Sequence, residues 1–148
     1  MKQILMITMM WLLMTATAQA QSGLSVSPLF EGKVIPTQRM VETRVKGKML
    51  SKYQLNFFRS VRFKANNKQE INRVHDMVEQ DMKKYPGYMY ADNYSSGKSH
   101  SRETLMLQLP KQGNLNRFLC YKRNNEEVTV IYMEGTLNSL ETLRELIK

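Results

Sequence analysis

Cysteine, proline and glycine are scarce in this chain, and each shortage excludes a class of protein. The 148 residues include one Cys, four Pro and seven Gly. One Cys excludes a disulfide-stapled miniprotein and a four-cysteine zinc module. Four Pro and seven Gly exclude a collagen-like chain and a Pro/Gly linker protein. The chain therefore has to fold around a hydrophobic core.

The recurring catalytic motifs are missing as well. The sequence contains no G-x-S-x-G, no H-E-x-x-H, no Walker loop and no G-x-G-x-x-G. The carboxylates Asp76, Glu79 and Asp81 fall in a helical segment, where we expect charged side chains to face solvent rather than to line a pocket. The sequence therefore names no catalytic residue and favours a non-enzymatic protein, with an enzyme as the open alternative.

Metal and thiol chemistry have few candidate residues. His75 and His100 are the only histidines, and Cys120 is the only cysteine. A zinc site needs three or four converging ligands, and nothing in the spacing predicts that these residues converge. We expect no metal and no cofactor, and the roles of the two histidines stay open. Cys120 stands between Leu119 and Tyr121 in a strand-like run, which predicts a buried thiol. A dimer-forming or catalytic thiol is the alternative.

The composition is that of one folded domain with a surplus of positive charge. Hydrophobic residues make up 42% of the chain and charged residues 24%, which is ordinary for a globular protein. The 22 Lys and Arg outnumber the 13 Asp and Glu, which gives a formal net charge of +9. A chain of this length can bury one core and no more.

The N-terminus has the three parts of a secretory signal peptide. Lys2 supplies the positive charge, residues 4–14 are apolar, and a small polar stretch ends in Ala18-x-Ala20. A membrane anchor is the alternative, but a spanning helix needs about 20 apolar residues. We therefore predict cleavage after Ala20 and export to the periplasm or the extracellular space, with no transmembrane span left in the mature protein.

Beyond the signal peptide the chain divides into an entry segment and one domain. Residues 21–38 contain two prolines and show no sustained period, which predicts an extended N-terminal segment. Residues 39–148 show continuous strand and helix patterns, without an internal repeat. We expect a signal peptide over 1–20, an extended segment over 21–38 and a single domain over 39–148.

Period-two alternation predicts several strands. Residues 41–46 alternate apolar and charged side chains, and residues 57–64 place Phe57, Val61 and Phe63 on one face. Further strands are predicted, separated by short polar turns, at residues 88–92, 103–109, 117–122 and 128–133. Short polar turns imply antiparallel pairing.

Two helices complete the pattern. Residues 66–85 carry one apolar stripe, with Asn67 as the expected N-cap and Pro86 after the end. A short helix near the C-terminus, capped by Asn138 or Ser139, carries leucines on one side. A helix with one apolar stripe has to cover a sheet face. The expected fold is an α+β two-layer sandwich, a mostly antiparallel sheet of about five or six strands covered by two helices.

Positive charge is concentrated in the first half of the mature chain. Residues 31–64 hold nine basic and two acidic residues. If the first two strands pair, Arg44 and Lys46 could share a face with Arg62 and Lys64, which would form an anion-binding patch. A solvated basic face without a ligand is the alternative. Export excludes nucleic acid, so the expected partner is an anionic envelope component or an acidic protein, and the oligomeric state stays open.

The chain resembles small exported proteins of Gram-negative gut bacteria that are grouped as domains of unknown function. The similar residues are Gly47-x-x-Leu50-x-x-Tyr53, Phe58-Arg59-Ser60, Leu107-Gln108-Leu109-Pro110, Tyr121-Lys122-Arg123, and Val128 to Gly135 followed by Leu140-Glu141-Thr142-Leu143. This resemblance implies a periplasmic or secreted α+β protein and carries over no catalytic residue.

The sequence thus favours an exported, non-enzymatic binding or accessory protein of the bacterial cell envelope. Two alternatives remain. One is a periplasmic hydrolase that uses carboxylates not identified by the sequence, and the other is an accessory protein in envelope signalling. A deep pocket lined by Asp and Glu would favour the hydrolase, whereas an open sheet surface would favour a binding or accessory role.

The cleavage prediction has a direct test. Protein recovered from the exported fraction should begin at Gln21, and its emission should come from tyrosine alone, because Trp11 is the only tryptophan and leaves with the signal peptide. Intact-mass measurement checks the N-terminus. An exported fraction that retains Met1 would contradict cleavage after Ala20.

Overall fold

A computed structural model describes residues 23–87, 89–95, 97–137 and 140–146 of the chain. The predicted signal peptide and its cleavage site lie outside the described residues. So do Asn138 and Ser139, the expected caps of the C-terminal helix. Within the described ranges, no helix is both long and apolar enough to cross a membrane.

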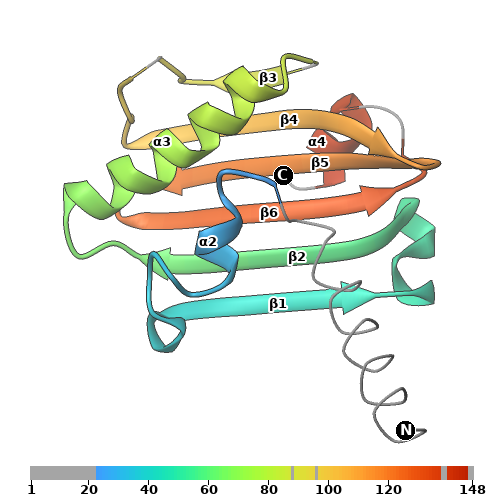
Figure 1. Cartoon of the computed structure of the whole chain (residues 1–148), viewed down its shortest axis with the longest axis horizontal. Helices are drawn as coiled ribbons and strands as arrows, with labels where there is room; N and C mark the ends of the chain where they lie inside the picture. Colours follow the sequence, from blue (N-terminus) through green and yellow to red (C-terminus); the bar gives the residue numbers. More distant parts are fainter. Residues whose placement is uncertain (1–22, 88, 96, 138–139, 147–148) are drawn as a thin grey trace, which may run out of the picture.

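A six-stranded antiparallel sheet forms the centre of the molecule (Figure 1). In chain order the strands are β1 (Met40–Lys46), β2 (Leu55–Lys64), β3 (Met89–Asp92), β4 (Arg102–Gln112), β5 (Leu115–Asn124) and β6 (Glu127–Gly135). Their spatial order is β1-β2-β6-β5-β4-β3, so β1 and β3 are the two edge strands. The prediction of a mostly antiparallel sheet within an α+β fold is confirmed.

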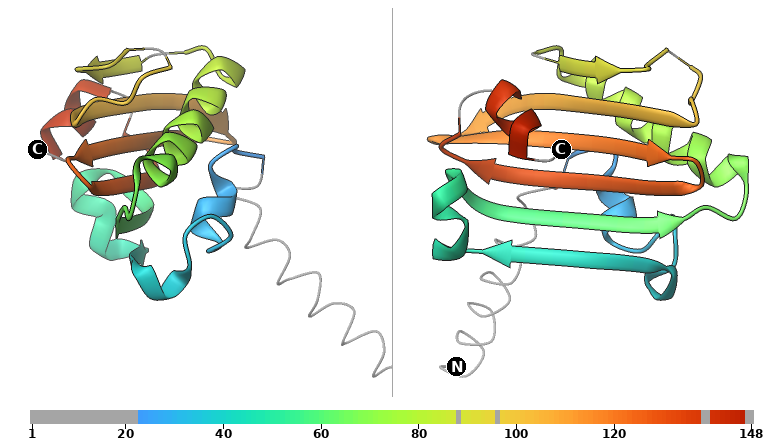
Figure 2. Two further views of the ribbon diagram at one scale, coloured as in Figure 1. Left: turned by 90° about the vertical axis from the view of Figure 1, so that its left-hand side faces the viewer. Right: turned by 180° about the vertical axis from the view of Figure 1, so that it is seen from behind.

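Helical elements lie on both faces of this sheet. They are α2 (Ser27–Phe30), α3 (Lys68–Lys84), α4 (Leu140–Leu146) and the short 3-10 helices η1 (Thr37–Arg39) and η2 (Lys48–Tyr53). Figure 2 shows α2 and α3 on one face and α4 on the other. We refer to these as the α3 side and the α4 side. The expected arrangement of two layers with two helices is not confirmed, because helices cover the sheet from both sides.

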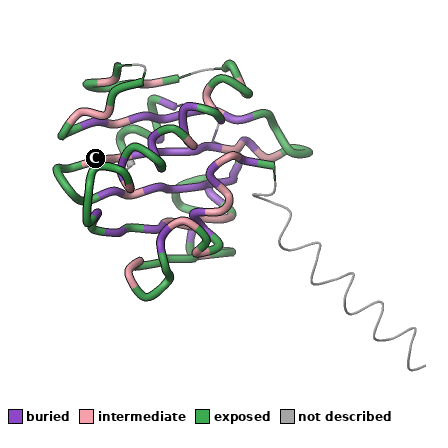
Figure 3. The backbone as a smooth tube through the Cα atoms, turned by 60° about the vertical axis from the view of Figure 1, so that its left-hand side comes forward, coloured by how far each residue is buried: buried purple, intermediate pink, exposed green. Residues whose placement is uncertain are grey.

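The central strands bury side chains on both faces, so the sheet separates two hydrophobic cores. The expectation of a single core is therefore wrong, because helices pack against the sheet from both sides. On the α3 side, Val61, Leu105 and Val130 pack with Val74 and other apolar residues of α3. The α4-side core combines strand residues with the C-terminal helix: Met106, Phe118, Cys120, Ile131, Met133, Leu140 and Leu143. The purple, buried stretches in Figure 3 run along the middle of the sheet, while both edges are largely exposed.

Helix α3 forms where the sequence predicts it, with one important difference in what it buries. The Asn67 side chain accepts a hydrogen bond from the backbone N–H of Glu70 at 3.0 Å and so caps the helix. Apolar residues of the predicted stripe are buried, but so are His75, Glu79 and Asp81. The expectation that Glu79 and Asp81 face solvent is therefore wrong, because both carboxylates find donors inside the fold.

Asp81 anchors the segment that precedes the sheet. Its carboxylate accepts hydrogen bonds from the backbone N–H groups of Ser25 and Val26, the latter at 3.1 Å. Burial raises the pKa of Asp81 even though these hydrogen bonds oppose the shift. The segment contributes buried residues to the α3-side core: Leu24, Val26, Leu29, Phe30 and Ile35. Where the sequence suggested an extended segment over 21–38, the described part includes α2 and packs as part of the domain.

Cys120 is fully buried on the α4 side of the sheet, as predicted. Burial raises the pKa of its thiol to about 12, so almost no reactive thiolate forms at neutral pH. We predict that a bulky thiol reagent labels Cys120 only after the protein is unfolded in denaturant, and mass spectrometry would follow the modification. Rapid labelling of the native protein would contradict a core position and restore the dimer or catalytic alternatives.

Candidate functional site

The four basic residues singled out by the sequence are split between the two faces of the sheet. In the β1–β2 register, Arg44 lies opposite Arg59, and Arg62 lies opposite Val41. Opposite residues share a face, and side chains alternate along a strand. Arg44 and Lys46 therefore lie on the α3 side, whereas Arg62 and Lys64 lie on the α4 side. The expected single patch does not form.

The two basic residues on the α4 side have acidic neighbours. Arg62 lies 3.6 Å from Glu127, and Lys64 lies 3.7 Å from Glu126. Both pairs are well exposed, so each contributes little to stability. This part of the predicted patch matches the alternative of a solvated basic face.

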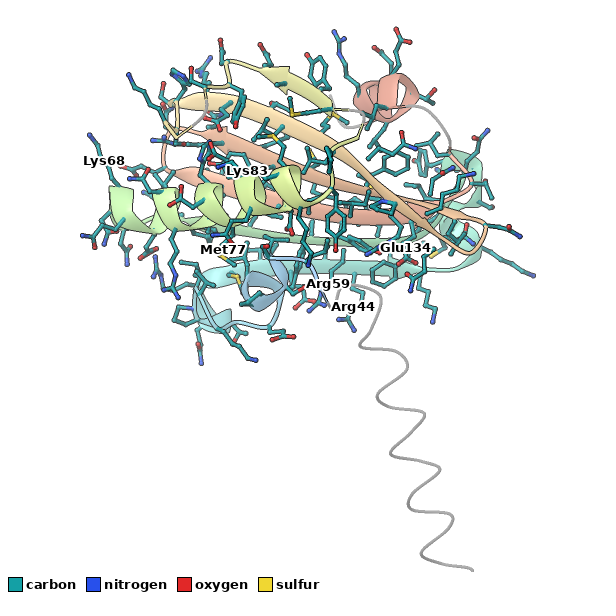
Figure 4. All side chains as sticks on the ribbon, turned by 45° about the horizontal axis from the view of Figure 1, so that its top comes forward. Arg44, Arg59, Lys68, Met77, Lys83 and Glu134 are labelled. Atoms are coloured by element: carbon teal, nitrogen blue, oxygen red, sulfur yellow. The ribbon has the colours of Figure 1, made fainter. Side chains whose placement is uncertain are left out.

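On the α3 side, two arginines lie opposite each other and share one carboxylate. Arg59 Nε lies 2.8 Å from Glu42 Oε1, and Arg44 Nε lies 3.8 Å from the same oxygen. The Arg59 guanidinium also donates to the Phe30 carbonyl at 2.9 Å. Figure 4 shows Arg44 and Arg59 beside each other near the edge of the sheet. Like charges at opposite positions destabilise a sheet unless they are neutralised, and one carboxylate serves both guanidinium groups here.

Positive charge continues from β1 into η2. Arg44 and Lys46 of β1 and Lys48 and Lys52 of η2 form what we call the basic edge, and all four are exposed. Exposed apolar side chains lie nearby: Met49 and Tyr53 of η2 are 78% and 39% exposed, whereas Val41 of β1, 57% exposed, lies on the α4 side. Large exposed apolar side chains beside an edge strand are typical of a docking surface.

An open pocket of about 460 Å³ lies where β1 turns into η2. Its lining consists of Lys46, Gly47, Lys48, Ser51, Gln54, Leu55, Asn56 and Thr136. Gly47 makes the turn with φ 96° and ψ −152°, a backbone conformation open almost only to glycine. Two lysines and no carboxylate line the pocket, so it favours an anionic group.

A second site, which the sequence did not predict, lies under α3. His75 is buried between two glutamates: its Nε2 lies 2.7 Å from Glu103 Oε1 and its Nδ1 lies 3.4 Å from Glu79 Oε1. The His75 side chain is 2% exposed, that of Glu79 8% and that of Glu103 0%. We call these three residues the Glu–His–Glu cluster.

The two glutamates also hold the polar connection between β3 and β4. Glu79 Oε1 accepts hydrogen bonds from the Tyr94 hydroxyl at 3.2 Å and from the Gly97 backbone N–H at 2.8 Å. Glu103 Oε2 accepts from the His100 backbone N–H at 2.7 Å. The cluster therefore fixes this connection against α3 and β4.

The Glu–His–Glu cluster has the contacts of a charge cluster rather than of a metal centre. His75, Asp76 and Glu79 place possible ligand atoms within 4.8 Å of one another, and Asp76 is exposed. However, both His75 nitrogens already face carboxylates, and Glu79 Oε1 accepts two hydrogen bonds. The His75 Nε2 atom lies close to Glu103 Oε1 but makes no hydrogen bond to it.

Some of the cluster could have been found in the sequence. Glu103 has the same parity as Leu105, Leu107 and Leu109, so alternation alone places its carboxylate on the core face of β4. Glu79 follows His75 by four residues, which is one helical turn. A carboxylate on an apolar strand face calls for a buried partner, and the nearby helix supplies one.

The fold and these sites define a class before any comparison: a small α+β protein with an exposed basic edge and a buried charge cluster. The family of unknown function DUF6108 matches residues 13–147, and the chain belongs to this family. No curated protein and no solved structure matches it. The expectation of a family of unknown function is confirmed, whereas export and a gut-bacterial origin stay predictions.

The two histidines provide a test of the Glu–His–Glu cluster. We predict that His75→Ala lowers the free energy of unfolding by about 3–5 kcal/mol, because it leaves two buried carboxylates without their shared partner. His100→Ala is the matched control: its ring forms a hydrogen bond with the exposed Ser95 hydroxyl at 2.9 Å, and its loss should cost less than about 1 kcal/mol. Urea unfolding measures both. Equal small losses would contradict a stabilising cluster.

Proposed function

We propose that this protein is exported and acts as a non-enzymatic binding or accessory protein of the bacterial cell envelope. Its partner is an acidic protein segment, which docks in extended form along the basic edge. Export rests on the A-x-A cleavage pattern after an apolar run that is too short to span a membrane. The docking mode rests on the geometry of β1 and η2.

The observation that carries this proposal is the state of β1. In the sheet of the described residues, β1 pairs only with β2, so its outer side presents backbone N–H and C=O groups without a neighbouring strand. An extended peptide can add to such an edge through main-chain hydrogen bonds. The exposed side chains of Met49 and Tyr53 offer apolar contact beside that edge.

Charge decides which kind of strand fits. The basic edge holds four cations, and Glu42 is the only acidic residue between Met40 and Tyr53. A second copy of this chain would bring the same cations against them, so like-charge repulsion disfavours pairing between two β1 edges. A strand with carboxylates would neutralise Lys46 and Lys48 and would relieve the repulsion between Arg44 and Arg59.

The pockets support binding over hydrolysis. Four pockets lined by described residues have no carboxylate in their lining. A glycoside hydrolase needs two carboxylates that flank the scissile bond. Glu79 and Glu103 are buried and engaged with His75, so they do not offer that arrangement.

The test uses a synthetic ten-residue peptide of alternating Glu and Val, with a Lys–Val peptide for comparison. We expect the Glu–Val peptide to bind, and to bind less tightly as salt rises, because screening weakens attraction between exposed charges. The double variant Lys46→Glu/Lys48→Glu should reduce affinity roughly tenfold, since each exposed ion pair is worth up to about 1 kcal/mol. Fluorescence anisotropy of a labelled peptide measures the affinity.

Arg62→Glu/Lys64→Glu is the matched control, because it changes the net charge by the same amount on the opposite face of the sheet. This variant should bind the Glu–Val peptide as the parent does. Equal weakening by both double variants would show a general charge effect and contradict docking at the basic edge. Binding to anionic phospholipid vesicles but not to the peptide would contradict a protein partner.

A further inference from the structure

A separate pocket of about 310 Å³ lies between the first turns of α3 and the polar connection that leads into β4. Its lining is Lys68, Ile71 and Asn72 of α3, Ser99 and Ser101 of the connection, and Arg123 of β5. Two side chains are cationic, three can donate hydrogen bonds without charge, one is apolar, and none is a carboxylate. We call this the Arg123 pocket.

Arg123 is held in a fixed position in this pocket. Its Nε donates to the Asn125 carbonyl at 2.7 Å, and its Nη1 donates to the Ser99 hydroxyl at 3.0 Å. A guanidinium has five N–H donors in a rigid plane. These two hydrogen bonds therefore orient the group and do not use all of its N–H donors. A guanidinium that is already oriented loses less freedom when it binds an anion than a mobile surface arginine does.

The serine wall of the pocket is fixed by the buried network described above. The Ser99 hydroxyl lies 3.4 Å from the Tyr121 hydroxyl, and the Tyr121 ring packs edge-on against His75. The next residue, His100, is held through its backbone N–H by Glu103. The Glu–His–Glu cluster thus positions Ser99 and its neighbours opposite Lys68 and Asn72.

We infer that the Arg123 pocket binds a tetrahedral oxyanion, a phosphate or sulfate group carried by a small molecule or by a lipid. Guanidinium and ammonium groups form charge-assisted hydrogen bonds with such oxyanions, and hydroxyl and amide donors complete the shell. The donors come from α3, from the β3–β4 connection and from β5, so they approach from several directions, which suits a tetrahedral group better than a planar carboxylate. The volume also admits a small substituent on the anion.

This site is independent of the proposed docking edge. Figure 4 shows Lys68 at the far end of the molecule from Arg44. The basic edge accepts an extended strand, whereas the Arg123 pocket is lined by residues of three separate segments and fits a compact group. Either site can be removed without changing the residues of the other.

The first experiment titrates the protein with inorganic phosphate at constant ionic strength, with chloride as the replaced anion. Backbone amide shifts in NMR spectra should move for Ser99, Ser101 and Lys68 and should give a saturating curve. Arg123→Gln should weaken phosphate binding at least about tenfold, because it removes charge-assisted hydrogen bonds. Sulfate should compete with phosphate, and acetate should compete poorly.

Arg102→Gln is the matched control. Arg102 lines the neighbouring pocket with Asn93 and Tyr94 rather than the Arg123 pocket, so its loss changes the net charge equally and should leave phosphate binding intact. Because Arg123→Gln also removes two internal hydrogen bonds and could unfold the protein, Lys68→Gln is the second variant. Lys68 is exposed at the start of α3, so its replacement should leave the fold intact. The Lys68→Gln variant should nevertheless bind phosphate more weakly.

The source of the oxyanion is distinguished by two further probes. If the protein binds a soluble phosphomonoester more tightly than phosphatidylglycerol vesicles, the ligand is a small molecule. If it binds the vesicles more tightly, the ligand is a lipid headgroup. Either result supports the pocket as an oxyanion site. Two results would overturn the inference. One is the absence of saturable amide shifts up to about 50 mM phosphate, because charge-assisted hydrogen bonds in a formed site should give tighter binding. The other is equal weakening by Arg102→Gln and Arg123→Gln, because a specific site depends on its own arginine.

Discussion

Burial of the Glu79 and Glu103 carboxylates is the constraint on which the packing of α3, β4 and the β3–β4 connection depends. A buried carboxylate is costly unless a positive partner and hydrogen-bond donors reach it. His75 lies between the two, and backbone N–H groups of Gly97 and His100 complete them. These contacts set the distance between α3 and β4 and fix the β3–β4 connection. The Arg123 pocket exists because that connection is fixed there.

Burial of acidic side chains also affects the charge of the outer surface. Glu79, Asp81 and Glu103 are buried within the fold, so these three acidic residues add no negative charge to the surface. The exterior is therefore more basic than the overall composition suggests. Two places concentrate this surplus: the basic edge, which is open and strand-like, and the Arg123 pocket, which is compact. Their different shapes suit different anionic partners at opposite ends of the sheet.

Local patterns predicted the elements of this fold well. Alternation of apolar and polar residues predicted the strands, and the stripe from Ile71 to Tyr85 with its Asn67 cap predicted α3. Cys120 was correctly expected to be buried from its strand-like neighbours. Residues 23–38 were harder, because the contacts that order them are with Asp81, 55 and more residues away, and no local period records such a contact.

The sequence by itself determined the six strands, the two longer helices, the antiparallel α+β class and the basic surplus, because these follow from periods and counts along the chain. Only the tertiary structure decided which charges meet. The β1–β2 register places Arg44 opposite Arg59 rather than opposite Arg62. A register shift of one residue would move each side chain to the other face of the sheet. Likewise His75, Glu79 and Glu103 converge only because α3 packs across β4. Register and packing depend on the whole core, and therefore no local pattern contains them.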